Sequence, residues 1–117
     1  MQPTSLKWLN DIADAATFIV DVTVGRSRVD YGEDRVLRLA VERSFEIIGE
    51  ALLRLERRDP ATAARIPDYR KIIGFRNRLA HGYDDIDYEQ VWEIIERFLP
   101  TLRQAVDRLL SEAEADG

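Results

Sequence analysis

The stretch AVERSFEIIGEALLRL, residues 40–55, decides the fold. Its apolar side chains recur at intervals of three and four residues, the spacing that places side chains on one face of an α-helix. Phe45 and Ile47 widen this apolar stripe beyond what a single core face needs. We therefore predict a helix over about residues 33–57 that contacts more than one surface.

A glycine lies near the middle of this predicted helix. Gly49 costs the helix about 1 kcal/mol relative to alanine, so its position needs a reason. Glycine has no Cβ, which allows another backbone or side chain to approach closely. We expect a second helix to pack tightly against this one at Gly49.

Three more segments show helical spacing. The apolar pattern predicts helices over residues 4–24, from Pro67 to Ala80, and from Asp87 through Leu109. Thr4 or Ser5 is a suitable cap for the helix over 4–24. Pro67 suits the first position of the helix that ends at Ala80, and Asp87 should cap the last helix.

Prolines and polar segments predict the connections. Pro100 should kink the last helix or split it in two, because proline removes a backbone hydrogen bond and clashes with the preceding turn. We expect a connector over residues 26–32, with Tyr31 packed inward, a short helical turn at 61–65 and a fraying polar tail at 111–117. With no strand-period segment, the sequence predicts one domain, 1–117, as an all-α antiparallel up-and-down bundle of four to five helices.

Composition excludes several classes of function. The chain has no cysteine, which rules out disulfides, thiolate zinc sites and cysteine nucleophiles. No apolar run approaches membrane-spanning length, and the start MQPTSLKWLND lacks the basic-then-apolar pattern of a signal peptide. We expect a soluble, cytoplasmic protein without a cofactor.

The charge changes sign between two neighbouring segments. The net charge of −5 argues against broad, non-specific binding of nucleic acid. Residues 65–78 are nevertheless basic, with Asp68 as their only acid, whereas residues 84–96 carry several acids and no base. A phosphate-binding face beside an acidic face would explain the pattern, and so would two solvated helix faces.

The two charged segments meet at RNRLAHGYDD, residues 76–85, which holds the only histidine, His81. Gly82 suits the position just beyond a helix, so His81 should lie at the helix end. Arginine offers a forked, permanently charged donor set for phosphate, and histidine exchanges its proton near neutral pH. RNA cleavage by its own 2′-hydroxyl uses such groups without a metal. Because that reaction usually needs an acid and a base, a two-fold dimer could supply a second His81.

Each of these residues also has an ordinary structural explanation. His81 could cap the last carbonyls of its helix, and Arg76 could pair with Asp84 or Glu50. Arg78 fits a structural contact or a phosphate contact better than a catalytic role. Tyr83 could pack between helices.

The acids after the motif could be imagined as a site for a hard metal ion. They lack a defined loop pattern, and a run of this kind is usually solvated. Asp87 is better explained as a helix cap. We predict no metal at these residues, which are Asp84, Asp85, Asp87 and Glu89.

The motif R-x4-H-x-Y, formed by Arg76, His81 and Tyr83, resembles the signature of the HepT-like members of the HEPN superfamily. The stretch AVERSFEIIGEALLRL, with its Gly49-Glu50 pair, resembles the apolar helix of the same family. DYRKIIGFRNRLAHGY and DIDYEQVWEIIERFLPTL are similar to the family as well. The resemblance covers about residues 6–110.

The resemblance implies an all-α bundle that dimerises so that two R-x4-H motifs line one cleft. It also implies the toxin of a type II/VII-like toxin–antitoxin module, a metal-independent endoribonuclease acting on tRNA or mRNA. The partner would be a minimal nucleotidyltransferase antitoxin of the MntA-like kind. Arg76 and His81 would be catalytic, Asn77 would support them, and Tyr83 would accept adenylyl groups from the antitoxin.

A different class of function stays open. The chain could be a non-catalytic helical partner of the nucleotidyltransferase, which binds that enzyme and is modified on Tyr83. A nucleotidyltransferase encoded next to this chain would fit both the toxin and the non-catalytic partner, so only a test of activity on RNA separates the two.

Overall fold

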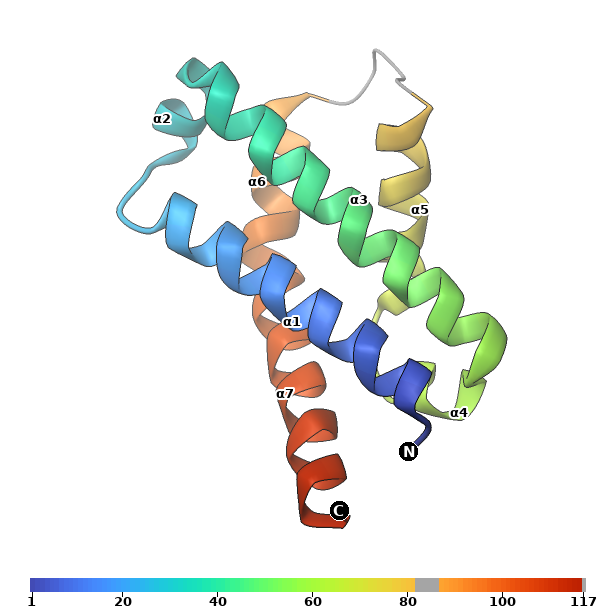
Figure 1. Cartoon of the computed structure of the whole chain (residues 1–117). Helices are drawn as coiled ribbons and strands as arrows, with labels where there is room; N and C mark the ends of the chain where they lie inside the picture. The colour runs from blue at the N-terminus through green and yellow to red at the C-terminus, as the bar shows by residue number, and fades with distance from the viewer. Residues whose placement is uncertain (82–86, 117) are drawn as a thin grey trace.

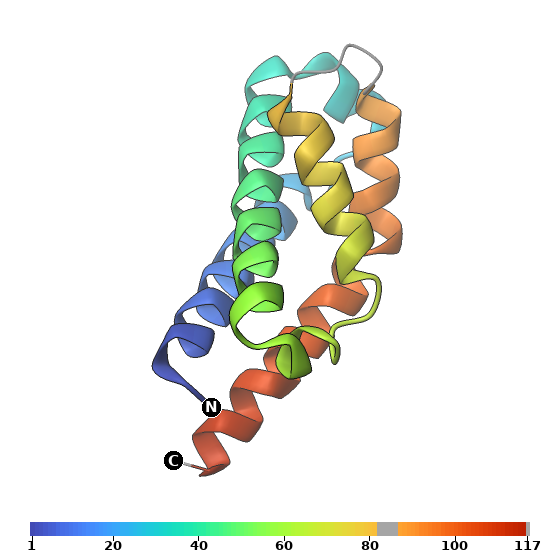
Figure 2. The same ribbon diagram turned by 90° about the vertical axis from the view of Figure 1, so that its right-hand side faces the viewer.

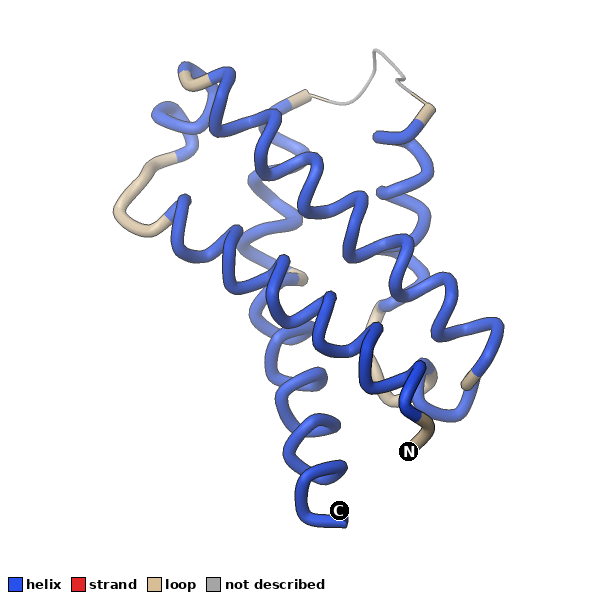
Figure 3. Tube along the Cα trace, viewed as in Figure 1, coloured by secondary structure: helices blue, strands red, loops and turns tan. Residues whose placement is uncertain are grey.

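Helices form nearly all of the chain that the structure describes. The computed structural model describes residues 1–81 and 87–116. It contains no strand within these residues (Figure 3), as the sequence predicts. The helices are α1 (Pro3–Thr23), α2 (Arg28–Glu33), α3 (Arg35–Arg58), α4 (Pro60–Ala63), α5 (Tyr69–Ala80), α6 (Tyr88–Arg97) and α7 (Leu99–Asp116).

The central helix is α3. It runs antiparallel to α1 and packs against α1 on one side and α5 on the other (Figure 1). The other face of α1 packs on α7, and α6 lies across the bundle from α1 and α3 (Figure 2). The five helices with ten residues or more form the predicted bundle, and α2 and α4 are short additions at its ends.

The wide apolar stripe of α3 divides between two surfaces. Phe45 is completely buried, and its ring meets the ring of Phe75 edge to face, with centroids 5.4 Å apart. Ile47 is 38% exposed and lies on the outer side of the α1–α3 pair. One part of the stripe therefore builds the core, and the other leaves apolar surface on the outside.

Arg76 of α5 packs closely on the backbone of α3 at Gly49. A Cβ atom placed on Gly49 would overlap Cβ and Cγ of Arg76 and would lie 3.4 Å from its Cδ. The Cβ atom of Arg76 moves only with its backbone, so the two helices would have to separate. The expected tight packing at Gly49 is confirmed.

The last helix is split at its proline, as predicted. α6 ends at Arg97 and α7 begins at Leu99, so Pro100 is the second residue of α7, where its missing N–H is not needed. The predicted cap of α6 is confirmed as well, because the Asp87 carboxylate accepts a 2.9 Å hydrogen bond from the backbone N–H of Gln90.

One predicted helix start and one predicted helix cap are wrong. α5 begins at Tyr69 rather than Pro67, because Asp68 adopts the left-handed conformation with φ 58° and cannot continue a helix. α1 begins at Pro3 without a side-chain cap. The hydroxyl of Ser5 instead donates a 2.8 Å hydrogen bond to the Asp59 carboxylate, which ties α1 to the start of α4.

The connector and the tail are more helical than predicted. A reciprocal capping box between Ser27 and Asp30 starts α2 inside the expected connector, and Tyr31 is buried against Trp92, as predicted. The tail up to Asp116 continues α7 instead of fraying. An ion pair of 2.7 Å between Arg65 and Glu112 holds this last part of α7 to the rest of the molecule.

Over residues 1–81 and 87–116, none of the helices is both long enough and apolar enough to cross a bilayer.

Replacing Gly49 with alanine should destabilise the fold although alanine is the better helix former. The overlap with Arg76 should cost about 1–3 kcal/mol, more than the gain in helix propensity. Gly74 of α5 is the matched control, because a Cβ there meets nothing within 4 Å. Gly74→Ala should stabilise by about 0.5–1 kcal/mol in urea unfolding. Equal stabilisation by the two substitutions would contradict the close contact at Gly49.

Candidate functional site

Arg76 lies on the side of α5 that faces α3, directly over Gly49. One terminal nitrogen, Nη2, forms a 2.9 Å ion pair with Oε2 of Glu50, and the other, Nη1, donates a 3.0 Å hydrogen bond to Oδ1 of Asn77. The Nε atom is buried and makes no hydrogen bond within the described residues. The side chain is 26% exposed, so the guanidinium is fixed and still reaches the surface.

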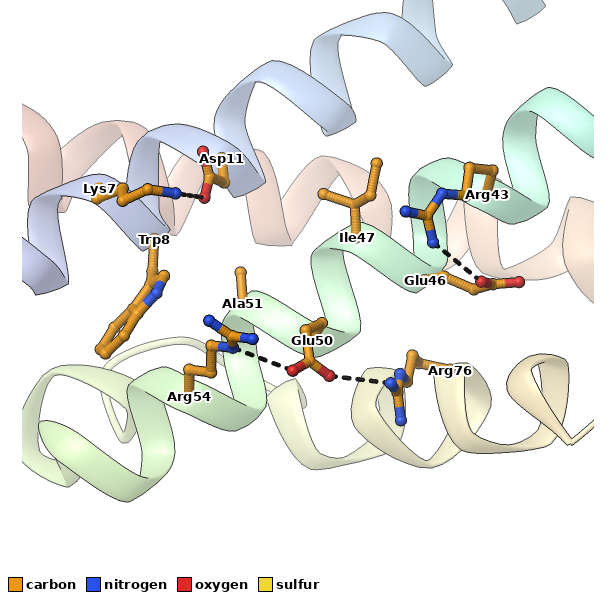
Figure 4. A pocket seen from close by; sticks show the side chains of 10 residues that line it. All are labelled: Lys7, Trp8, Asp11, Arg43, Glu46, Ile47, Glu50, Ala51, Arg54 and Arg76. Atoms are coloured by element: carbon orange, nitrogen blue, oxygen red, sulfur yellow. Dashed lines mark hydrogen bonds and ion pairs between the residues drawn. The ribbon is translucent and has the colours of Figure 1, made fainter.

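Glu50 joins two arginines. Its Oε2 atom pairs with Arg76, and its Oε1 atom accepts a 3.0 Å hydrogen bond from Nε of Arg54, one turn further along α3 (Figure 4). One carboxylate thus faces two guanidinium groups. The cluster Arg54–Glu50–Arg76 keeps an excess of one positive charge, which favours an anion.

This cluster forms part of the wall of an open pocket of about 210 Å³ between α1, α3 and the Arg76 side chain (Figure 4). Two further ion pairs line it, Lys7–Asp11 at 2.9 Å and Arg43–Glu46 at 3.3 Å. The complete lining is Lys7, Trp8, Asp11, Arg43, Glu46, Ile47, Glu50, Ala51, Arg54 and Arg76. The pocket combines charged groups of both signs with the flat side chain of a tryptophan.

His81 is the last described residue of this part of the chain and ends α5. Its backbone N–H donates a 3.1 Å hydrogen bond to the carbonyl of Asn77, and its side chain is exposed. Asn77 therefore contacts both described residues of the motif, Arg76 through its side chain and His81 through its carbonyl. Five residues of helix separate Arg76 from His81 by about 7.5 Å along the axis.

Comparison with known proteins identifies the family. The model of the HepT-like family, described as Ribonuclease HepT-like, matches residues 12–109, which include the whole R-x4-H-x-Y motif. The chain belongs to this family. The resemblance found in the sequence is thereby confirmed.

Curated relatives carry names that agree with the HepT-like family. Putative RNase TTE0752 of Caldanaerobacter subterraneus is 32% identical over 109 residues, 93% of this chain and 96% of the relative. Putative RNase MJ1380 of Methanocaldococcus jannaschii is 31% identical over 103 residues, 86% of this chain and 91% of the relative. Probable ribonuclease HepT of Thermococcus cleftensis is 28% identical over 109 residues, 93% of this chain and 98% of the relative. No solved structure matches the chain significantly.

Arg78 differs from Arg76 in its surroundings. Side chains two residues apart point to different sides of a helix, and Nη2 of Arg78 donates a 3.2 Å hydrogen bond to Oε1 of Gln90 on α6. This contact joins α5 to α6. It favours the structural alternative considered for Arg78 and leaves the phosphate contact as a prediction.

Part of the HepT-like motif lies outside the described residues. Tyr83 is that part of the motif; Asp84 and Asp85, which follow the motif, also lie outside the described residues, so the predictions for all three stay predictions. Within residues 1–81 and 87–116 no group of three possible metal ligands comes together. Of the two ion pairs considered for Arg76, the structure contains the one with Glu50.

Sequence reasoning missed Arg54 and Trp8 as neighbours of the HepT-like motif. Arg54 lies four residues after Glu50, a spacing that pairs opposite charges on one helix face and could have indicated the contact. Trp8 has no such signal, because only the packing of α1 on α3 brings it to the pocket.

Proposed function

We propose that this HepT-like chain is a metal-independent endoribonuclease acting on cellular RNA, tRNA or mRNA, in the cytoplasm, with Arg76 and His81 as catalytic residues. The observation that carries the proposal is the guanidinium of Arg76, fixed at the edge of a pocket five residues from the only histidine. Membership of a family described as ribonucleases supports the same activity.

The proposed reaction needs a base, an acid and a charge to stabilise the transition state. The imidazole of His81 removes the proton of a 2′-hydroxyl, and the 2′-oxygen attacks the neighbouring phosphorus. The bond from phosphorus to the 5′-oxygen breaks, and that oxygen takes a proton, which leaves a 2′,3′-cyclic phosphate and a 5′-hydroxyl. Arg76 stabilises the negative charge on the non-bridging oxygens.

Cleavage of RNA by the purified protein tests this mechanism. Labelled tRNA and mRNA in excess EDTA should be cut by the wild type and left with cyclic phosphate ends. His81→Ala and Arg76→Ala should each slow cleavage by at least about 100-fold, the usual contribution of such groups. Equal cleavage by the wild type and His81→Ala would identify a contaminating nuclease and contradict the mechanism.

We also propose that the active form is a homodimer. The chain has one histidine, whereas the reaction uses a base and an acid. An apolar groove on the outer side of α1 and α3 supports this proposal. Phe18 is 42% exposed and Ile47 38% exposed, and both line this groove, which continues into the pocket through Ile47, Asp11 and Arg43. A two-fold dimer through the groove would bring two Arg76 pockets to one cleft.

The oligomeric state should depend on the apolar groove. Ile47→Glu should convert a dimer to a monomer and abolish cleavage, because a buried unpaired carboxylate costs several kcal/mol. Val29 of α2 is the matched control, since it is exposed and does not line the groove. Val29→Glu should remain a dimer in sedimentation analysis. A monomeric, active wild type would contradict the proposal.

A third part of the proposal concerns regulation. The chain would be the toxin of a type II/VII-like toxin–antitoxin module, neutralised by a minimal nucleotidyltransferase that adenylylates Tyr83. Tyr83 follows His81 by two residues, so an added phosphate would bring negative charge close to the proposed site. Repulsion and bulk would exclude RNA. The alternative is a non-catalytic helical partner that is modified at the same tyrosine.

Modification can be measured by intact mass. With ATP and the cognate nucleotidyltransferase, the wild type should gain the mass of an AMP group and lose cleavage activity, whereas Tyr83→Phe should gain nothing. Tyr88→Phe is the control, because Tyr88 is exposed on α6 and should not be the acceptor. If the wild-type protein stays unmodified, the proposal that Tyr83 accepts the adenylyl group is wrong. Modification of a chain that never cleaves RNA would favour the non-catalytic alternative.

A further inference from the structure

We infer that Glu50 is a positioning residue, which holds the guanidinium of Arg76 in the orientation that receives the phosphate. The inference rests on the proposed function, in which Arg76 is catalytic. Glu50 lies outside the R-x4-H-x-Y motif and on a different helix, and it contacts Arg76 directly through a 2.9 Å ion pair.

The contacts of Arg76 leave a defined set of donors. A guanidinium has five N–H groups in one plane. The bonds to Glu50 and Asn77 each use one, and the Nε–H is buried against the protein. One N–H on each terminal nitrogen therefore remains available. Two neighbouring donors in one plane match two oxygens of a phosphate.

Glu50 is itself held in place. It lies on α3 next to Gly49, and Gly49 allows the stem of Arg76 to pack against this helix. Its second oxygen is bound by Arg54 at 3.0 Å. An arginine side chain has about 2 kcal/mol of rotamer entropy to lose, and a carboxylate fixed in advance removes part of that cost when RNA binds.

The carboxylate also competes with phosphate, and Arg54 reduces this disadvantage. If Glu50 faced Arg76 alone, the pair would be neutral and would attract an anion weakly. With Arg54 on the other oxygen, the Arg54–Glu50–Arg76 cluster retains one positive charge. Glu50 can therefore orient Arg76 without cancelling its charge.

The same helix pair offers a matched control for a merely structural role. Glu56 of α3 forms a 3.2 Å ion pair with Arg70 of α5, which is also a Glu–Arg contact between these two helices. A hydrogen bond from the Tyr69 hydroxyl, supported by Arg70, holds the pKa of Glu56 below its usual range. Within the described residues, the hydrogen bonds and the ion pair of Glu56 are made with Tyr69 and Arg70 and not with Arg76, so a change there alters the helix contact and leaves Arg76 as it is.

The test compares Glu50→Ala and Glu50→Gln with Glu56→Ala. Glu50→Ala should reduce the single-turnover rate at saturating RNA by about 10- to 100-fold, the effect expected from a misplaced group. Affinity for an uncleavable 2′-O-methyl RNA should not fall by more than about 3-fold, because Arg76 keeps its charge and the Arg54–Glu50–Arg76 cluster loses its one negative charge. Glu50→Gln keeps an acceptor oxygen and should recover part of the rate. Glu56→Ala should stay within about 2-fold of the wild type in both measurements.

Each outcome has a distinct meaning. An unchanged rate in Glu50→Ala, with His81→Ala inactive, would overturn the inference and leave the ribonuclease mechanism intact. Equal losses in Glu50→Ala and Glu56→Ala would also overturn it, because both would then act through the α3–α5 contact alone. If the wild-type protein leaves RNA uncut, the proposed function is wrong, and the inference that rests on it is wrong as well. Thermal unfolding of each variant confirms that the fold is retained.

Discussion

The approach of α5 to α3 at Gly49 is the constraint on which the rest of the structure depends. The absence of a Cβ lets the stem of Arg76 lie on the backbone of α3. This separation also suits the edge-to-face contact of Phe45, one turn before Gly49 on α3, with Phe75, the residue next to Arg76 on α5. Core packing and the position of the arginine are therefore set by one contact. A longer distance between the helices would weaken both.

Arg76 and His81 are held in place by different interactions. Arg76 is fixed by tertiary contacts, a carboxylate on α3 and the packing against Gly49. His81 is positioned by the last backbone hydrogen bond of its own helix, to the carbonyl of Asn77. In the proposed mechanism Arg76 binds phosphate, and rigidity favours this role because the charge is presented at one place. His81, the proposed proton carrier, is exposed at the helix end, where it could reach a substrate or a second chain.

What the sequence predicted well was local. The cap at Asp87 and the split at Pro100 follow from single residues whose backbone chemistry acts within one turn. The predicted start of α5 was wrong because Asp68 adopts the left-handed conformation, which is uncommon and which no neighbouring residue requires. The short α2 was missed because six residues show too little periodicity, although the spacing of Ser27 and Asp30 in the sequence is that of a capping box. For the site, the sequence offered Glu50 as one possible contact of Arg76, but only the packing of two helices selects it.

Overall charge is a weak guide to what this chain binds. The net charge is −5, yet the field that a phosphate meets is set by groups within about 8 Å, the screening length in physiological salt. Around Arg76 that field comes from the cluster Arg54–Glu50–Arg76, with its excess of one positive charge, and from the two neutral ion pairs of the same pocket, Lys7–Asp11 and Arg43–Glu46. The acids elsewhere on the surface lower non-specific attraction to RNA without cancelling this local excess. An acidic protein can therefore hold a phosphate at one point while it avoids binding nucleic acid at every other.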